Sequence, residues 1–134
     1  MRDITEVRNY FKDDRFCTLN GVIIDSVTTE SCICSLSIED RHLNALGNVQ
    51  GGMIFTIADF AFAVHARAME FTTVLRHADI TYLKPVRGSK LIAKAIPISQ
   101  GRNMSLYKTE LYDDKGVLVA FAMMNGYVFN STKE

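Results

Sequence analysis

The sequence lacks the features that mark several specialised classes of protein. Its 134 residues include 15 basic and 15 acidic side chains, so a basic surface for nucleic acid is unsupported. There are only three cysteines, and Cys32 and Cys34 lie two apart in a strand-like segment where both face the same side. Neither a disulfide framework nor a zinc cluster is expected, and the thiols are predicted to be buried and reduced.

No hydrophobic run is long enough to cross a membrane. The longest, Met53 to Val64, is interrupted by Thr56 and Asp59 and falls short of the roughly 20 residues that a span needs. The N-terminus is charged from its second residue and has no apolar signal region. The sequence therefore predicts a cytoplasmic protein without a membrane partner, in which this run is a buried helix.

Several catalytic motifs are also missing. There is no Gly-x-Ser-x-Gly elbow, no phosphate-binding loop with its lysine, no Gly-x-Gly-x-x-Gly after a strand and no His-x-x-x-His pair. Serine-triad chemistry, nucleotide hydrolysis and a metal site are therefore unsupported, and no cofactor is expected.

The chain has the length and composition of one globular domain, residues 1–134, with 48% hydrophobic residues. Residues 1–20 are predicted to form an N-terminal helix and a lead-in, because apolar residues recur at helical spacing from Ile4 to Phe11. Asp3 followed by Glu6 resembles a capping box at the start of that helix.

The rest of the chain predicts an α+β fold. Residues from Met53 to about Glu70 form a helix that is apolar on nearly every side and must be surrounded by protein. The surrounding segments are strand-like, which predicts an antiparallel sheet of five to six strands wrapped around the helix. Pro97 indicates an edge position or a bulge, and Val117 to Met124 predicts a central strand covered on both faces. The predicted strands cover residues 22–28, 32–38, 74–83, 90–98, 104–112 and 118–129.

Asp59 is the unexpected residue of the apolar helix. A carboxylate without partners in a low-dielectric interior costs several kcal/mol or is neutralised by a raised pKa. Two interpretations follow. Asp59 either bonds to a backbone group or an arginine inside the core, or it faces a cleft and takes part in catalysis.

Gly51 and Gly52 begin the same helix, where the first N–H groups have no intrahelical acceptor and the helix dipole favours an anion. These donors could form an oxyanion hole, although a plain helix start would look the same. With a rise of about 1.5 Å per residue, Asp59 lies roughly 12 Å from Gly51 along the axis. If both serve one reaction, two antiparallel helices of a homodimer must share each site.

The same residues resemble the hotdog-fold acyl-CoA thioesterases of the phenylacetic-acid-degradation, or PaaI-like, group. The similarity extends to the C-terminus through "ADITYLKPVRGSKLIAKA" and "GRNMSLYKTELYDDKGVLVAFAMMNGYV". The family motif, His-x-Asn-x-x-Gly-x-x-His-Gly-Gly with Asp seven residues later, corresponds to His42, Asn44, Gly47, Gln50, Gly51, Gly52 and Asp59.

The resemblance implies a hotdog fold and a role for each matched position. Asp59 would act as general base or nucleophile, the Gly51 N–H would stabilise the oxyanion, and Asn44 would orient water or the acid. Coenzyme A would be part of the substrate, and the protein would be a homodimer or a dimer of dimers. The implied substrate-binding residues are Gly52, Lys84, Arg87, Gly101, Arg102 and Asn103.

Two positions depart from the family pattern. Gln50 replaces the family histidine, so it can donate or accept a hydrogen bond but cannot shuttle a proton. Leu75 stands where some relatives carry a helper serine. Of the three histidines, His42 is expected to anchor the motif loop, the loop before Gly51 that carries the family motif. His65 and His77 are interpreted as structural.

Three functions remain open at this stage. The first is hydrolysis of an aromatic or medium-length acyl-CoA. The second is a non-catalytic module that binds an acyl-CoA, which the glutamine at position 50 motivates. A hydratase is less favoured, because such enzymes need a histidine beside the acid and none is found in register.

Overall fold

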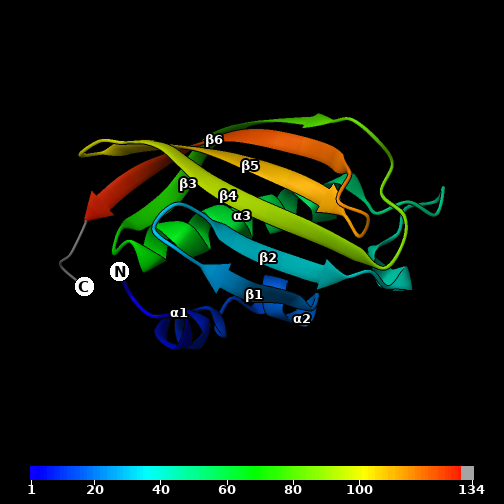
Figure 1. Cartoon of the computed structure of the whole chain (residues 1–134), viewed down its shortest axis with the longest axis horizontal. Coiled ribbons are helices and arrows are strands. Elements are labelled where there is room, and N and C mark those ends of the chain that lie inside the picture. Colours follow the sequence, from blue (N-terminus) through cyan, green and yellow to red (C-terminus); the bar gives the residue numbers. More distant parts are fainter. Residues whose placement is uncertain (131–134) are drawn as a thin grey trace.

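The computed structural model describes residues 1–130. The helices are α1 (Ile4–Phe11), α2 (Arg15–Leu19) and α3 (Gly51–Ala68), with a short 3₁₀ turn, η1, at Asp40–His42. The strands are β1 (Val22–Val27), β2 (Cys32–Ser37), β3 (Thr72–Tyr82), β4 (Lys90–Gln100), β5 (Met104–Asp113) and β6 (Leu118–Asn130) (Figure 1).

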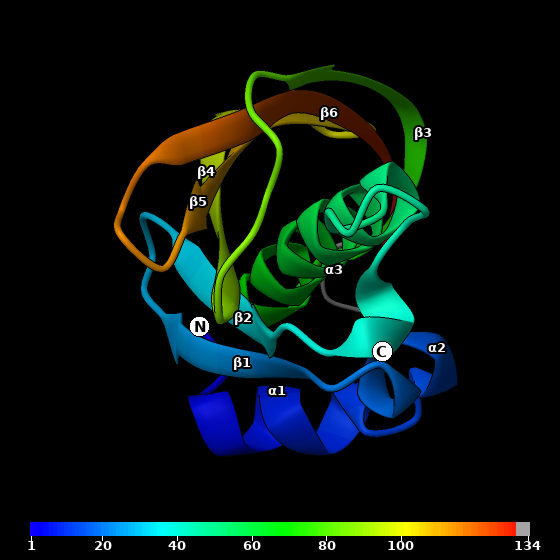
Figure 2. The ribbon, with the colours of Figure 1, turned by 90° about the vertical axis from the view of Figure 1, so that its right-hand side faces the viewer.

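All six strands belong to one antiparallel sheet with the order β1-β2-β4-β5-β6-β3. The sheet curves around α3, and within the described residues no strand covers the side of the helix between β3 and α2 (Figure 2). This is the predicted α+β architecture, a sheet of six strands wrapped around a long helix.

Helix α3 is buried because its apolar residues occur all round its circumference. Ile57, Phe62 and Val64 are fully buried against the sheet. The alternating strand residues that face the helix include small ones, such as Ala93 and Ala95 of β4, which let the helix approach closely. One stripe of α3 stays partly or fully exposed, and we call it the open stripe: Gly52, Thr56, Asp59 and Ala63.

The N-terminal segment packs beside this helix. Asp3 caps α1 by accepting a hydrogen bond from the Glu6 N–H at 2.9 Å, and Phe11 of α1 meets Phe60 of α3 edge to face. The predicted lead-in contains a separate five-residue helix, α2, which the sequence did not predict as an element. Its start is capped by Asp14, so a single turn forms without a hydrophobic period.

Two predictions about strands are refined by the structure. Pro97 lies past Ala95, the last β4 residue paired with β2, and beside a shift of register against β5. The missing N–H therefore costs no ladder bond to β2. β6 lies between β5 and β3 as a central strand, but the prediction that both its faces are covered is wrong within the single chain. Phe121 and Met123 point away from α3 and are only half-buried.

The three cysteines are free and buried, as predicted. No helix within residues 1–130 is long and apolar enough to cross a membrane.

Candidate functional site

Asp59 lies on the open stripe of α3 and is partly exposed. Its carboxylate has no hydrogen bond or ion pair within residues 1–130, so the alternative of a paired core residue does not describe it. Partial burial raises the pKa of Asp59 above its ordinary value, and the nearby Asp14 carboxylate adds to the shift. Within the described residues, therefore, no hydrogen bond or ion pair stabilises the ionised form of Asp59.

The Gly51 N–H, at the first turn of α3, is already bonded. It donates to Oε1 of Gln50 at 2.9 Å, and the Gly51 carbonyl accepts a hydrogen bond from the Tyr82 hydroxyl at 2.9 Å. A substrate oxygen could bond to the Gly51 N–H only by displacing the Gln50 amide. A Cβ at position 51 would lie 3.4 Å from the Tyr82 ring, which is van der Waals contact, so the first turn of α3 and the tyrosine pack directly against each other.

Asn44 holds the loop that precedes α3. Its Oδ1 accepts from the backbone N–H groups of Leu46 at 2.9 Å and Asn48 at 3.1 Å. The side-chain oxygen is therefore used within the loop, and the amide nitrogen is the group that Asn44 can offer to a ligand.

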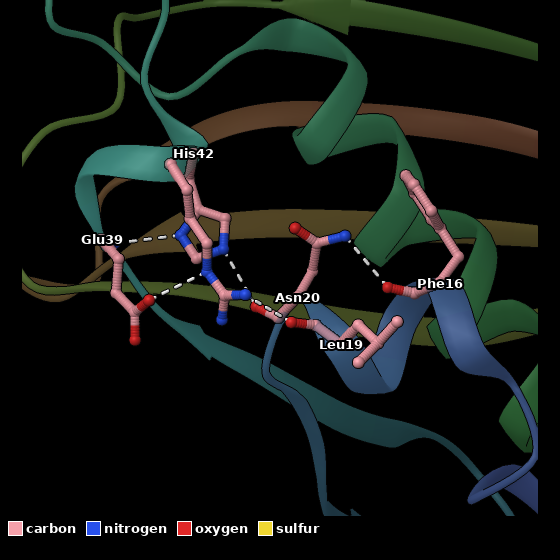
Figure 3. A network of polar contacts seen from close by, with 6 residues as sticks. Phe16, Leu19, Asn20, Glu39 and His42 are labelled. Atoms are coloured by element: carbon pink, nitrogen blue, oxygen red, sulfur yellow. Dashed lines mark hydrogen bonds and ion pairs between the residues drawn. The ribbon is translucent and has the colours of Figure 1, made fainter.

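His42 connects this loop to α2 (Figure 3). Its Nδ1 accepts from the Glu39 N–H, so Nε2 carries the proton and donates to the Asn20 carbonyl; both distances are 2.9 Å. The His42 carbonyl in turn accepts from the Gln50 N–H at 2.8 Å. His42 therefore anchors the motif loop, as predicted, and also fixes the end of α2.

Two clefts lie on either side of the first turn of α3. The β3 cleft has a volume of about 310 Å³, and its lining includes Asn44, Gly51, Tyr82 and Lys84. The α2 cleft has a volume of about 390 Å³. It is lined by Phe16, Asn20, Arg41, His42, Gln50, Gly52, Met53 and Thr56.

The structure brings together only part of the predicted substrate-binding set. Lys84 lines the β3 cleft, and Arg87 in the same loop donates to Asn48 Oδ1. Gly101, Arg102 and Asn103 form the β4–β5 turn at the other end of β4. Eleven strand residues separate the two groups, which places them roughly 35 Å apart. A shared role for both groups at one ligand remains a prediction that requires a second chain.

Of the other two histidines, the structure supports a structural role for His65 but not for His77. His65 is fully buried, with Nδ1 at 2.6 Å from the Tyr107 hydroxyl and Nε2 at 2.9 Å from the Thr28 carbonyl. Burial lowers its pKa, which favours the neutral ring. His77 is exposed on β3 and lies 3.4 Å from Asp79.

Two residues of this region were not singled out from the sequence. Tyr82 belongs to the segment "TYLKP" at the end of β3, but nothing in that segment indicates its bond to the Gly51 carbonyl. Phe16 lies in the lead-in, where no periodicity indicates that it would line a cleft together with residues of α3. Both features bring together segments that are far apart in the chain.

Comparison with known proteins agrees with this architecture. Residues 46–120, more than half of the chain, match the family model described as "Thioesterase superfamily". The mouse acyl-coenzyme A thioesterase 13 is 27% identical over 96 residues, covering 69% of this chain and 69% of the relative. The Escherichia coli acyl-coenzyme A thioesterase PaaI is 25% identical over 111 residues, covering 82% of this chain and 79% of the relative.

Solved structures share the fold. The E. coli PaaI structure superposes with a TM-score of 0.89 at 22% identity, covering 96% of this chain and 94% of that one. A hypothetical thioesterase from Streptococcus pneumoniae, solved with coenzyme A, gives a TM-score of 0.84 at 21% identity and covers 92% and 99%. Together with the family match, these similarities show that the chain belongs to the thioesterase superfamily as a hotdog-fold thioester hydrolase of the PaaI-like group.

Proposed function

We propose that this protein hydrolyses the thioester of an aromatic or medium-length acyl-CoA. The observation that carries the proposal is Asp59, an unpaired carboxylate on the open stripe of the helix that begins with Gly51. The names of the mouse and E. coli relatives support coenzyme A as the thiol of the substrate.

The reaction requires two copies of the chain. Gly51 and Asp59 are eight residues apart on one helix, roughly 12 Å along its axis, and cannot both reach one carbonyl group. Within residues 1–130, β3 is an edge strand whose ladder partner is β6, and the open stripe is the part of α3 that the described elements leave partly or fully exposed. Pairing of two β3 edges would let the open stripes meet in an antiparallel arrangement.

In this dimer, Asp59 of one protomer faces the first turn of α3 in its partner. Acting as general base, Asp59 takes a proton from water, whose oxygen forms a bond to the thioester carbon. The Gly51 N–H stabilises the negative charge on the carbonyl oxygen. The C–S bond then breaks, coenzyme A leaves as the thiol after taking the proton, and a carboxylic acid remains. Direct attack by the carboxylate is the alternative to the base role.

Gln50 must move before the Gly51 N–H can act. Its amide oxygen holds the position that the substrate oxygen would take, 2.9 Å from the Gly51 nitrogen. Rotation of the side chain would free that donor, and the amide nitrogen could then donate to the same thioester oxygen. Asn44 and its amide nitrogen are placed in the β3 cleft to orient water or the acid.

A non-catalytic module that binds acyl-CoA is the second candidate. The filled Gly51 N–H favours it, since a site that never needs an oxyanion donor could keep that group capped. In this case the β3 cleft, with Lys84 among its lining residues, would hold the coenzyme without turnover.

Release of free coenzyme A from a panel of acyl-CoA thioesters separates the two functions. The wild type is expected to release thiol, and Asp59→Asn to be slower by about 10²- to 10⁴-fold. Equal rates for the two proteins would remove Asp59 from the mechanism. Micromolar binding of acyl-CoA by calorimetry without any thiol release would establish the binding module.

The enzyme is predicted to be a dimer or a dimer of dimers, and the half-buried apolar residues on the outer face of the sheet, such as Phe121 and Met123, offer a surface for the larger assembly. Sedimentation velocity distinguishes the dimer from the dimer of dimers.

Three further predictions come from the sequence. They are a cytoplasmic location, one domain over residues 1–134 and the lack of any cofactor beyond the coenzyme of the substrate.

A further inference from the structure

We propose that the α2 cleft receives the acyl group of the substrate and that Phe16 is the wall that determines which acyl groups are accepted. This inference rests on the proposed function, because it assigns one arm of an acyl-CoA to a cleft beside the reacting group.

The cleft opens onto the face of α3 that carries the proposed base. Gly52 and Thr56 line the cleft and belong to the open stripe, in which Asp59 follows Thr56 by one turn. Gln50 also lines this cleft, and its side chain accepts the hydrogen bond of the Gly51 N–H. An acyl group in this cleft would therefore have its carbonyl end near the first turn of α3.

The polar side chains around the cleft are largely engaged with one another. Both His42 nitrogens are bonded, Arg41 pairs with Glu39 at 2.9 Å and also donates to the Leu19 carbonyl, and the Asn20 amide nitrogen donates to the Phe16 carbonyl at 2.9 Å. These bonds compete with any polar ligand, because a ligand group would have to displace one of them.

What remains for a ligand is mainly apolar. The Thr56 hydroxyl donates to the Gly52 carbonyl at 2.8 Å, which leaves its methyl group for contact. Gly52 adds an open floor, since a Cβ there would find only Gln50 Cγ, at 4.0 Å. The Phe16 ring and the Met53 side chain complete the lining. Such a surface favours an uncharged hydrocarbon or aromatic group.

The two clefts differ in polarity, as the charged coenzyme and the apolar acyl group of an acyl-CoA do. The β3 cleft on the other side of the first turn has Lys84 among its lining residues, and this cation suits the phosphates of the coenzyme. The α2 cleft, about 390 Å³ in volume, falls at the small end of the range for ligand pockets, about 300–1,000 Å³. That size fits a medium-length or single-ring acyl group.

Phe16 is held in place without being covered. Its ring points away from the polar network in Figure 3 and is part of a residue that is 65% exposed. The bonds from Arg41 to the Leu19 carbonyl and from His42 to the Asn20 carbonyl fix the end of α2. A ligand would therefore cover an apolar ring that is already positioned.

The test compares Phe16→Ala with Leu19→Ala on acetyl-, hexanoyl- and phenylacetyl-CoA. Leu19 is the matched control, because it is 71% exposed on the same helix and its side chain does not line the cleft. Phe16→Ala is expected to lower kcat/KM about 10- to 100-fold for the two larger substrates, and less than about twofold for acetyl-CoA, which does not reach the ring. Leu19→Ala is expected to change none of the three.

A second variant and a second measurement keep the test decisive. Phe16→Leu retains part of the apolar wall and should fall between the wild type and Phe16→Ala. Calorimetry with hexyl- and ethyl-CoA thioethers reports binding without hydrolysis, and Phe16→Ala should weaken only the hexyl compound. An equal loss for all acyl lengths, or no loss for any, overturns the role of Phe16. Absence of hydrolysis together with selective loss of hexyl-CoA binding would instead overturn the catalytic proposal and keep the cleft assignment.

Discussion

Asp59 and His65 are six residues apart on α3, and the chain treats them in opposite ways. His65 is fully buried, and both of its ring nitrogens have partners in other elements, Tyr107 of β5 and the turn after β1. Asp59 is partly exposed and has no hydrogen-bond partner within residues 1–130. Burial disfavours the charged form of both, because it raises the pKa of Asp59 and lowers that of His65.

The difference lies in what the surrounding elements supply. Six residues correspond to about 240° around a helix, so the two side chains point to different sides. His65 points into the sheet, where a hydroxyl and a carbonyl satisfy it, and it connects three elements. Asp59 belongs to the partly exposed open stripe, where no described residue bonds to its carboxylate. A buried polar side chain whose hydrogen bonds are all made within the chain stabilises the fold. A partly buried polar side chain without a partner is a candidate for binding or catalysis.

Replacing Asp59 gives the largest expected effect and tests the functional half of the comparison. Asp59→Asn should lower kcat by about 10²- to 10⁴-fold because the base is lost. It should also raise the melting temperature at pH 7, since an ionised carboxylate is removed from a partly buried position. A calorimetric scan beside the activity assay checks both results. A variant that is both less active and less stable would mean that Asp59 has a structural partner.

The pH dependence of that gain follows from the sign of the shift. The folded-state pKa of Asp59 is raised, so the folded protein binds its proton more strongly than the unfolded chain does. The stabilisation from protonation is complete below the ordinary pKa of aspartate, about 3.9, and is lost as the pH rises through the raised value. The melting-temperature advantage of Asp59→Asn should therefore be present at pH 7 and should shrink as the pH is lowered toward about 4.

Replacing His65 tests the structural half. His65→Ala leaves the Tyr107 hydroxyl and the Thr28 carbonyl without their partner and opens a cavity, which should cost about 2–5 kcal/mol of the free energy of unfolding. Urea unfolding measures the loss. His77→Ala is the control, because this exposed histidine should cost less than about 0.5 kcal/mol. Similar losses at the two positions would contradict the assignment.

Gln50 belongs to both the structural and the functional half of the comparison. Its side chain caps α3, and in doing so it occupies the Gly51 N–H, the candidate oxyanion donor. Gln50→Glu keeps the shape, adds a negative charge at the helix start and should hold the Gly51 N–H more tightly. We expect kcat/KM to fall about 10- to 100-fold, with a gain in stability of about 0.3–1 kcal/mol. Gln50→Met, which leaves the donor open, should lose less activity. If Met were as damaging as Glu, the amide itself would be required.

Tyr82→Phe should give the smallest effect. It removes one hydrogen bond, from the hydroxyl to the Gly51 carbonyl, at a residue that is 48% exposed. The expected cost is about 0.5–1 kcal/mol, or a two- to fivefold loss in kcat/KM if the bond positions the Gly51 peptide. Tyr127→Phe, also an exposed tyrosine but on β6, is the control and should be neutral.

Much of the fold could be predicted because the chain carries strong periodic signals. The apolar circumference of α3 requires a surrounding sheet, and alternation in β2 and β4 defines the faces that cover it. The helix begins at Gly51 rather than at the predicted Met53, since the Gln50 side chain caps the first turn. α2 was not predicted because one turn held by an Asp14 cap leaves no hydrophobic period.

For the site, the sequence indicates which residues matter but not how they are bonded. Asp59 and Gly51 stand out because an acid and a glycine pair are unusual in such a helix. The capped N–H of Gly51, the Tyr82 bond and the Phe16 wall depend on segments that meet only in the folded chain. The separation of Lys84 from the turn containing Arg102 likewise follows from the length of β4, which lies between them.

The burial of the cysteines determines what a thiol reagent would detect. Cys32 and Cys34 are sealed between the sheet and α3, and burial together with Asp14 raises the pKa of Cys17 to about 12. Because thiolates are the reactive species, a chromogenic disulfide added to the folded protein should give almost no signal of its own. The same dye would count each coenzyme released during turnover. Without substrate, the same dye would report unfolding. Cys17 should react when α2 detaches, and Cys32 and Cys34 should react when the sheet opens.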